Sequence, residues 1–222
     1  MTVQLLPTVE VQTGPDPAAS VIWLHGLGAD GHDFEPAVPA LVGRGGAALR
    51  FVFPHAPLRA VTLNNGARMR AWYDILGFDR HAAQDEAGIR ASDRAVRALI
   101  ARENERGIAT ERIVLAGFSQ GGAMALYTGT RLPDRLGGII GLSCYLLLAE
   151  QLSAERSSAN QTTPIFMAHG TQDTVVSPRL GEQTRGRLEA EGYAVEWHSY
   201  PMAHAVCAEE LAAIAEFLHR VL

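Results

Sequence analysis

The sequence predicts a three-layer α/β domain with a mostly parallel central sheet. Short apolar runs that suit strands alternate along the chain with longer stretches of helical periodicity. Most of these runs are continuously apolar, which is typical of parallel strands buried on both faces. The length of 222 residues fits one such domain, and no linker or internal repeat divides it. We therefore expect a single domain over residues 1–222, with helices on both faces of the sheet.

The expected strands follow one another with turn residues between them. The first segment alternates weakly and ends at a Gly-Pro-Asp-Pro cluster, so it predicts one or two edge strands. Six apolar runs follow, and four of them stop at a glycine or a proline. In chain order, the strand segments are residues 3–13, 20–25, 49–53, 112–116, 136–142, 164–168 and 195–200.

Four helices are expected between and after these strands. Residues 84–105 repeat apolar side chains at helical spacing from Ile89 to Ile100, with arginines and acids on the other side. Strand–helix alternation of this kind places functional residues in the loops at the carboxyl ends of the strands. The remaining helices are expected at residues 119–131, 179–191 and 208–222.

The composition excludes several classes of function. The net charge of −5 argues against a nucleic-acid-binding surface. All 19 basic residues are arginine, which excludes Schiff-base chemistry on lysine and the phosphate-loop lysine of nucleotide hydrolases. Cys144 and Cys207 form no zinc or disulfide pattern. No run approaches the ~20 apolar residues of a membrane span and no leader peptide stands out, so we expect a cytoplasmic protein without an integral membrane span.

The most informative segment is residues 117–121, which read Gly-Phe-Ser-Gln-Gly. It follows the strand at 112–116 and opens the helix at 119–131, which is the context that a G-x-S-x-G nucleophile elbow requires. Such a turn crowds the neighbouring backbone, so the positions that flank the serine must lack side chains. We therefore predict that Ser119 is a catalytic nucleophile; the alternative is an ordinary serine N-cap.

A serine nucleophile needs a base and an acid, and in this fold both follow the serine along the chain. His204 lies in the loop after the last strand, where an imidazole can reach the serine, and is the predicted base. Asp173 lies in the turn after the strand at 164–168 and is the predicted acid that orients the histidine; its alternative is a local turn or helix cap. His169 ends a strand and is expected to have a structural role beside the turn, whereas His198 lies within a strand and is expected to point into a layer or to solvent.

A glycine-rich loop follows the strand at 20–25 and reads Gly-Leu-Gly-Ala-Asp-Gly. A dinucleotide-binding loop is disfavoured because no helix with the required glycine spacing follows it. The better interpretation is an oxyanion hole, in which the backbone N–H groups of Leu27 and Gln120 bind the tetrahedral intermediate. His25 and His32 fit no common metal-site spacing, so no metal is expected.

Together, these segments make the sequence resemble the small carboxylesterase and acyl-protein thioesterase group of α/β hydrolases, which is also called lysophospholipase-like. The resemblance runs in family order from about residue 21 to residue 204. The segments that carry it are residues 24–28, 54–57, 72–74, 117–122, 141–144, 169–173 and 201–204.

The resemblance implies an α/β-hydrolase fold and a serine hydrolase that cleaves short- to medium-chain carboxylic esters, acyl thioesters or lysophospholipids through an acyl-enzyme on Ser119. It also implies no cofactor, a small-molecule ester or thioester as substrate, transient contact with lipid, and a homodimer. Two other functions stay open: a dienelactone-type lactonase or a perhydrolase on the same triad, and a non-catalytic binding module. A serine at the elbow argues against the dienelactone type, and the complete triad argues against the binding module.

Some positions depart from the resembling family. Arg70 and Ala71 stand where the family usually has Pro-Ser, and a charged Arg70 near the acyl groove would alter the substrate preference. Tyr145 stands where the family commonly has tryptophan, and Ala203 replaces a glycine before His204. None of these departures falls on the predicted triad.

The substrate-binding residues are expected close to the elbow. Only residues 145–163 separate two of the predicted strands, which leaves no room for the large helical lid of many lipases. The loop after residues 72–74 is the other candidate cover for an acyl groove. The predicted substrate-binding residues are Leu63, Trp72, Ile75, Leu76, Phe78, Tyr145 and Val175.

Overall fold

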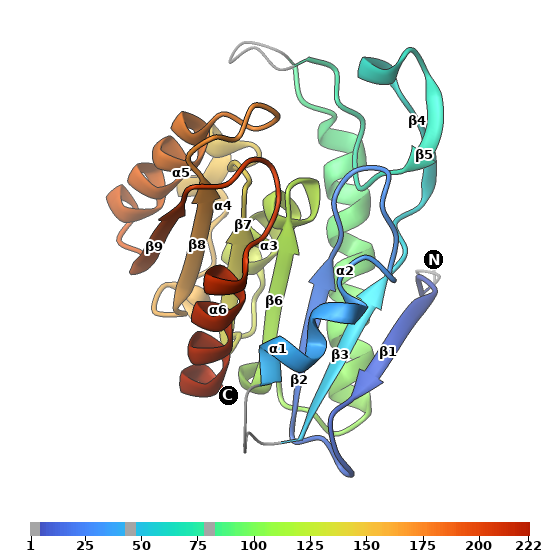
Figure 1. Ribbon diagram of the computed structural model, residues 1–222, viewed down its shortest axis with the longest axis vertical. Helices are drawn as coiled ribbons and strands as arrows, with labels where there is room; N and C mark the ends of the chain where they lie inside the picture. The colour runs from blue at the N-terminus through green and yellow to red at the C-terminus, as the bar shows by residue number, and fades with distance from the viewer. Residues whose placement is uncertain (1–4, 43–47, 78–82) are drawn as a thin grey trace.

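The central sheet of the computed structural model has seven strands in the order β1-β3-β2-β6-β7-β8-β9 (Figure 1). The structure describes residues 5–42, 48–77 and 83–222. Within them, every neighbouring pair of strands in this sheet is parallel except β1 and β3, so the predicted fold class is confirmed. The strands are β1 Thr8–Gln12, β2 Ala19–Leu24, β3 Leu49–Pro54, β6 Ile113–Phe118, β7 Gly138–Leu142, β8 Ile165–Gly170 and β9 Val195–Tyr200.

The inner strands form the buried centre of the fold. β2, β3, β7 and β8 are buried at every residue, as the continuous apolar runs predict. The edge strands β1 and β9 keep half-buried or exposed side chains. The parallel register pairs Leu24 with Gly117 and Gly117 with Gly141, so the carboxyl ends of β2, β6 and β7 meet at one edge of the sheet.

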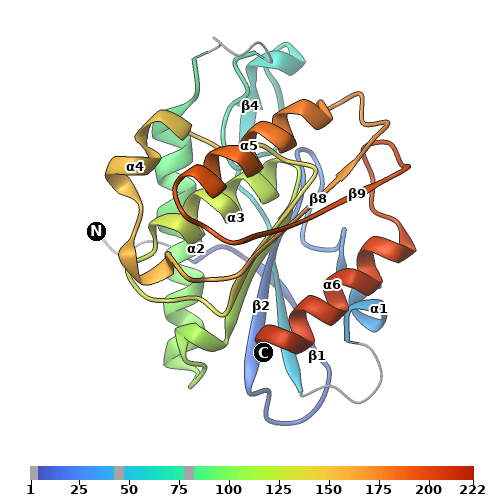
Figure 2. The ribbon, with the colours of Figure 1, turned by 90° about the vertical axis from the view of Figure 1, so that its left-hand side faces the viewer.

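Helices cover both faces of the sheet, as Figure 2 shows. α1 and α6 pack on one face through Leu41, Ile214 and Phe217, and α2, α3 and α5 pack on the other. The α-helices are α1 Val38–Val42, α2 Glu86–Glu105, α3 Gln120–Arg131, α4 Leu152–Glu155, α5 Pro178–Ala190 and α6 Ala208–Val221. Short 3₁₀ helices occupy Glu35–Ala37, Thr62–Asn64, Thr110–Arg112, Ala149–Gln151 and Ser158–Asn160. None of the helices in the described ranges is both long and apolar enough to cross a membrane.

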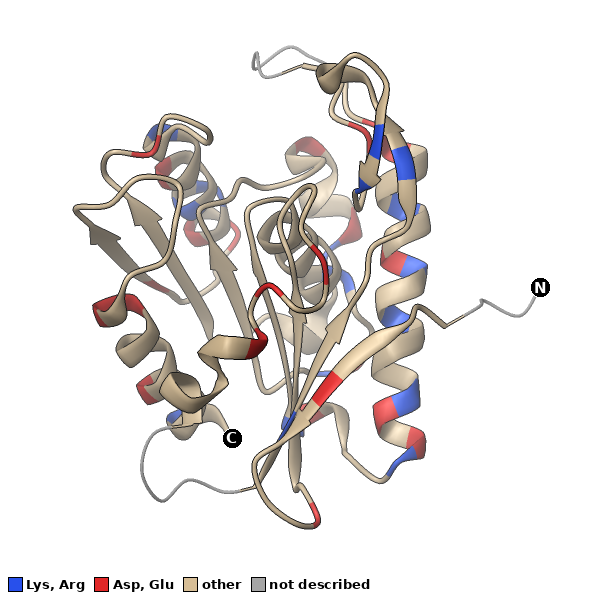
Figure 3. Cartoon of the chain, turned by 45° about the vertical axis from the view of Figure 1, so that its right-hand side comes forward, with Lys and Arg blue, Asp and Glu red and all other residues tan. Residues whose placement is uncertain are grey.

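Helix α2 has the predicted amphipathic pattern. Its apolar side chains from Ile89 to Ile100 are buried against the sheet and α3. Its outer side carries alternating basic and acidic residues (Figure 3), among them the ion pair of Arg97 with Asp93, whose N–O distance is 2.8 Å. Ion pairs between partly exposed side chains contribute little to stability, so the buried face holds this helix in place.

The structure also contains a two-stranded antiparallel sheet that the sequence analysis did not predict. It consists of β4 Leu58–Val61 and β5 Ala67–Arg70 and rises above the carboxyl ends of the central strands (Figure 1). Arginines lie on both of its strands (Figure 3), and because each strand is only four residues long, no continuous apolar run marks either strand in the sequence. The Asn65-Gly66 turn, with φ of 54° and 74°, is the hairpin signal that would have revealed it.

The connection between β7 and β8 contains no lid domain. It holds only α4 and two single-turn 3₁₀ helices. The carboxyl edge of the sheet is therefore bordered by short loops and by the β4–β5 hairpin.

Candidate active site

The turn between β6 and α3 places Ser119 in a strained conformation. Ser119 has φ of 54° and ψ of −119°, a region that residues other than glycine rarely adopt. Its side chain makes no cap hydrogen bond to the helix, so it does not act as an ordinary N-cap. Its backbone N–H donates to the carbonyl of Leu142 over 2.8 Å, which fixes the turn to the end of β7.

The glycines of the elbow are required by space, as the motif predicts. A Cβ atom on Gly117 would lie 2.3 Å from the carbonyl group of Gly121. A Cβ atom on Gly121 would lie 2.1 Å from the carbonyl oxygen of Leu24. Both neighbours are backbone atoms, one in the first turn of α3 and one at the end of β2, so neither can move aside.

Three side chains from three loops form one hydrogen-bonded chain. Nε2 of His204 lies 2.9 Å from Oγ of Ser119, and Nδ1 lies 2.7 Å from Oδ2 of Asp173. A carboxylate can only accept, so Nδ1–H donates to Asp173 and Nε2 accepts from the serine hydroxyl. The sequence-predicted nucleophile, base and acid therefore meet with the geometry of a Ser-His-Asp triad.

The carboxylate of Asp173 is fully buried and held from several sides. Its Oδ1 accepts from the backbone N–H groups of Val175 and Val176 at 2.8 and 2.9 Å. Nε2 of His169 lies 3.4 Å from its Oδ2 and 2.9 Å from the carbonyl of Val176. His169, for which the sequence predicts a structural role beside the turn, therefore contacts both the acid and the backbone of that turn.

The loops after β8 and β9 are packed together, which brings acid and base into contact. The backbone N–H of Gln172 donates to the carbonyl of Met202 over 3.0 Å. A Cβ atom on Gly170 would lie 2.4 Å from the carbonyl oxygens of Met202 and Ala203, so glycine is required here. The ring of Phe118 lies 4.7 Å from the imidazole of His204 and packs against it.

The side chain of Gln120 connects the elbow to the segment at 72–73, a contact that the sequence analysis did not predict. Its Oε1 accepts from the N–H of Trp72 at 2.7 Å, and its Nε2 donates to the carbonyl of Tyr73 at 2.8 Å. The indole of Trp72 donates in turn to the carbonyl of His25 at 2.9 Å. The elbow, the loop after β2 and the segment at 72–73 are therefore tied to one another.

The predicted oxyanion donors lie at the same cavity as the serine. Leu27 and Gln120 both line it together with Ser119 and His204. No hydrogen bond joins either backbone N–H to another group of the described residues. Gln120 begins helix α3, whose N-terminal dipole favours a developing negative charge.

His25 supports this loop and stays neutral. Its Nε2 accepts from the N–H of Ala56 at 3.0 Å, and its Nδ1 donates to the carbonyl of Gly26 at 2.7 Å. Burial lowers the pKa of His25, which favours the uncharged ring. Across the described ranges, no three His, Cys, Asp or Glu side chains come together as a metal site.

A cavity of about 240 Å³ opens beside Ser119. Of the predicted substrate-binding residues, Ile75, Tyr145 and Val175 line it. Tyr73 and Val176 line it as well, and the sequence prediction did not include them. The cavity is mostly apolar, with a few polar groups near the serine.

Four of the predicted substrate-binding residues do not line this cavity. Trp72 is fully buried, because its indole points back to the loop after β2. Leu63 and Leu76 lie on the surface outside the cavity and are 38 % and 44 % exposed. Phe78 lies outside the described residues.

Arg70 also lies away from the cavity, which corrects the expectation that it borders the acyl groove. Its guanidinium donates to the carbonyl of Ala56 at 2.9 Å, and its own carbonyl accepts from the N–H of Gly28 at 2.9 Å. Arg70 therefore holds the base of the hairpin against the glycine-rich loop.

The two cysteines are free thiols and stand apart from the nucleophile. Cys144 is buried, and burial raises the pKa of its thiol. Cys207 starts helix α6, and desolvation raises the pKa of its thiol as well. Neither environment activates a thiolate.

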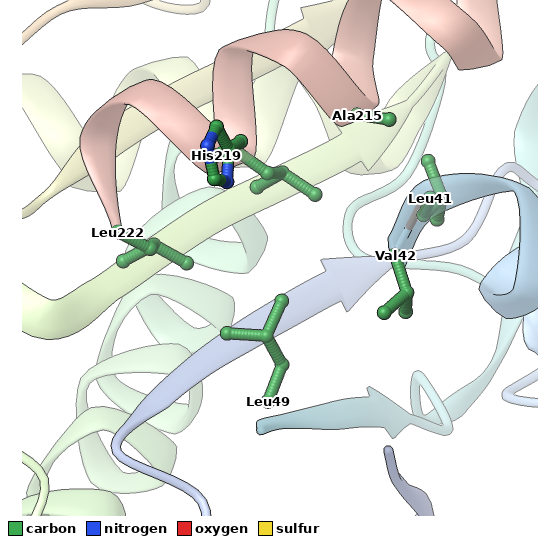
Figure 4. Close-up of a pocket in the computed structure, with 7 residues that line it drawn as sticks. Leu41, Val42, Leu49, Ala215, His219 and Leu222 are labelled. Carbon is green, nitrogen blue, oxygen red and sulfur yellow. The ribbon is translucent and has the colours of Figure 1, made fainter. Parts of the chain in front are cut away.

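A smaller hollow of about 130 Å³ lies between α1, α6 and the start of β3 (Figure 4). Its lining is apolar apart from His219. It lies at the amino end of β3, whereas the triad lies at the carboxyl ends of the strands. It brings no second set of reactive groups together.

The fold and the triad define an α/β hydrolase with a serine nucleophile. Residues 6–222 match the model of the family described as Phospholipase/Carboxylesterase, so the chain belongs to that family. It is 44 % identical to acyl-protein thioesterase 1 of Neurospora crassa over 96 % of this chain and 89 % of that protein. It is 36 % identical to acyl-protein thioesterase 1 of Mycosarcoma maydis over 100 % of this chain and 99 % of that protein.

Solved structures agree with this assignment. The crystal structure of acyl-protein thioesterase 2 from Zea mays superposes with a TM-score of 0.86 at 28 % identity, over 97 % of this chain and 98 % of that one. That of Arabidopsis thaliana SOBER1 has a TM-score of 0.86 at 31 % identity, over 91 % of this chain and 98 % of that one. The protein is a serine hydrolase of ester or thioester bonds, and the comparisons favour neither the lactonase or perhydrolase alternative nor a non-catalytic module.

Proposed function

We propose that the protein hydrolyses short- to medium-chain carboxylic esters and acyl thioesters through an acyl-enzyme on Ser119. The observation that carries this proposal is the hydrogen-bonded chain from Ser119 through His204 to Asp173, set on a strained elbow beside an apolar cavity. The serine, a weak nucleophile by itself, has its base within 2.9 Å.

The reaction has two halves, and in each half His204 acts first as a base and then as an acid. Ser119 Oγ attacks the acyl carbonyl while its proton passes to Nε2 of His204, and Asp173 stabilises the imidazolium that forms. The backbone N–H groups of Leu27 and Gln120 bind the oxyanion, and His204 then protonates the leaving group. Water deprotonated by His204 attacks the acyl-enzyme, and collapse of the second intermediate releases the acid and restores Ser119.

The size of the cavity supports small acyl groups. Ligand pockets usually measure ~300–1,000 Å³, and this cavity measures about 240 Å³. Each buried methylene contributes roughly 0.8 kcal/mol, so rates should rise over the first carbons and level off when the chain outgrows the cavity. The names of the Neurospora and Mycosarcoma relatives support acyl thioesters on proteins as a second substrate class.

The decisive experiment compares wild type with Ser119→Ala. Ester hydrolysis should fall by several orders of magnitude and covalent labelling by a fluorophosphonate should vanish, while the thermal unfolding curve stays that of a folded protein. Persistent labelling, or activity within tenfold of wild type, would sink the assignment. A panel of p-nitrophenyl esters, acyl-CoA thioesters and lysophospholipids, ranked by kcat/KM, then identifies the substrate class.

We further propose that the enzyme works in the cytoplasm as one domain, forms homodimers and contacts lipid transiently. Two unpaired cysteines suit a reducing compartment. Leu58 and Leu63 on the β4–β5 hairpin are 58 % and 38 % exposed and offer an apolar contact. Light scattering after gel filtration measures the oligomeric state, and flotation with neutral vesicles measures lipid contact.

A further inference from the structure

Two tyrosines that line the active-site cavity are joined through their hydroxyl groups. Oη of Tyr73 lies 3.0 Å from Oη of Tyr145, and both residues line the cavity together with Ser119. Tyr73 is fixed through its carbonyl, which accepts from Gln120. Tyr145 is fixed by its neighbour Leu146, whose N–H donates to a threonine on α5. The proposed mechanism uses neither hydroxyl.

The two hydroxyl groups have one more donor proton than their mutual hydrogen bond requires. Burial raises the pKa of both phenols, so both stay protonated. Two hydroxyl groups carry two donor protons, and their mutual hydrogen bond takes one. Among the described residues, no acceptor is hydrogen-bonded to the second proton.

The side chains of Gln120 and Asp33, which also line the cavity, do not accept that proton. Both ends of the Gln120 amide are engaged with backbone groups. Asp33 lines the exposed rim and makes no hydrogen bond to either tyrosine within the described part of the chain. Because Tyr73 is only 3 % exposed and Tyr145 is half-buried, we assign the free O–H to Tyr145.

A plain alkyl chain that covers this O–H leaves a buried donor without a partner, which disfavours the complex by roughly tenfold or more. A substrate oxygen at the same place removes that cost. We propose that the Tyr73–Tyr145 pair recognises a second oxygen of the substrate, a hydroxyl, ether or keto oxygen besides the ester being cleaved. The preferred substrates are then oxygenated esters. This inference rests on the proposed ester hydrolysis and specifies its substrate class.

The roles of the two tyrosines differ. Tyr145 contacts the substrate oxygen, and Tyr73 is a positioning residue that orients the Tyr145 hydroxyl. The preference for an oxygenated substrate is accordingly a property of this pair of side chains and not of the triad.

The test compares matched substrates that differ in one atom. In the first series, p-nitrophenyl hexanoate is compared with p-nitrophenyl 4-oxahexanoate and 5-oxahexanoate, in which an ether oxygen replaces a methylene. In the second series, hexyl butanoate is compared with 2-propoxyethyl butanoate, which places the oxygen in the leaving group. Each kcat/KM is divided by the rate of alkaline hydrolysis of the same ester, which removes inductive effects.

We expect wild type to prefer the oxygenated ester by about tenfold in one of the two series, and the responding series shows whether the oxygen belongs to the acyl group or to the leaving group. In Tyr145→Phe and in Tyr73→Phe/Tyr145→Phe this preference should fall below twofold. Tyr193→Phe is the matched control, because Tyr193 is buried but does not line the cavity, and it should keep the preference.

Fluorophosphonate titration counts the folded active sites in every variant. A wild-type preference below twofold in both series, or an undiminished preference in the double variant, overturns the inference. If the double variant is not labelled by the fluorophosphonate and therefore has no folded active site, the kcat/KM ratios of wild type and of Tyr145→Phe decide the test. Hydrolysis that depends on Ser119 but ignores the second oxygen leaves the proposed function standing and rejects only this inference.

Discussion

The two sides of the active-site cavity are built in different ways. On the catalytic side, Ser119, Asp173 and His204 each follow a strand of the central sheet, and backbone hydrogen bonds hold the turns that carry them. On the other side, the segment from β4 to residue 77 is a surface segment that is buried only in part, and its Leu58 and Leu76 are 58 % and 44 % exposed. The catalytic side is fixed by strand ends, whereas the substrate side depends on how a surface segment packs.

This difference explains where prediction from sequence works. A strand end has a defined direction and place in a parallel sheet, so motifs that follow strands locate catalytic groups. In the surface segment, two neighbouring aromatic residues take different positions: Trp72 points into the core, whereas Tyr73 lines the cavity. Apolar character alone does not distinguish them.

The largest expected effects fall on the catalytic side. His204→Ala should lower kcat by about 10⁶-fold and Asp173→Asn by about 10⁴-fold, because base and acid act only through the serine. Neither loss should add to that of Ser119→Ala in the double variants. Steady-state kinetics with p-nitrophenyl butanoate measure these values. If His169→Ala abolished activity while His204→Ala did not, the assignment of the base would be wrong.

The next effect tests whether the elbow depends on its glycines. In Gly121→Ala the new Cβ would lie 2.1 Å from a backbone oxygen of β2. We expect about a 100-fold loss of kcat/KM from displacement of Ser119 and a loss of roughly 3 kcal/mol in the free energy of unfolding. Gly186→Ala is the control, since a Cβ there meets nothing within 4 Å; it should stay active and fold at least as stably. Equal behaviour of the two variants would contradict the steric argument.

Gln120 joins the two sides, so its side chain tests their connection. Gln120→Ala removes two buried hydrogen bonds to the segment at 72–73 and leaves an N–H and a C=O unpaired. We expect kcat/KM to fall by roughly 10- to 100-fold and the segment to become more sensitive to protease. Gln172→Ala, at an exposed position beside Asp173, should change kcat/KM by less than twofold. A Gln120→Ala enzyme that matches this control would show that the two sides are independent.

The smallest effect concerns the substrate side alone. Ile75 lines the cavity and its neighbour Leu76 does not. Ile75→Ser should therefore lower kcat/KM for p-nitrophenyl hexanoate relative to acetate by about threefold to tenfold. Leu76→Ser should leave this ratio as in wild type. Chain-length profiles from acetate to palmitate measure both, and a change in Leu76→Ser alone would reverse the assignment of the two side chains.

The sequence by itself determined the buried strands, the nucleophile elbow and the order of the triad residues along the chain. Continuous apolar runs predicted the buried strands, because both faces of a parallel sheet are covered. The glycines around Ser119 predicted the elbow, because the backbone comes too close there for any Cβ atom. Chain order then predicted Asp173 and His204, since each occupies a loop at the carboxyl edge of the same sheet.

Only the tertiary structure decided which side chains face the substrate. The two short strands of the β4–β5 hairpin contain no continuous apolar run, and the position of the hairpin comes from contacts such as that of Arg70 with the carbonyl of Ala56. The contact of Tyr73 with Tyr145 joins residues 72 positions apart, and that of Gln120 with Trp72 joins residues 48 apart. No local pattern encodes such pairs, because their partners become neighbours only when the sheet, the hairpin and the loops have packed together.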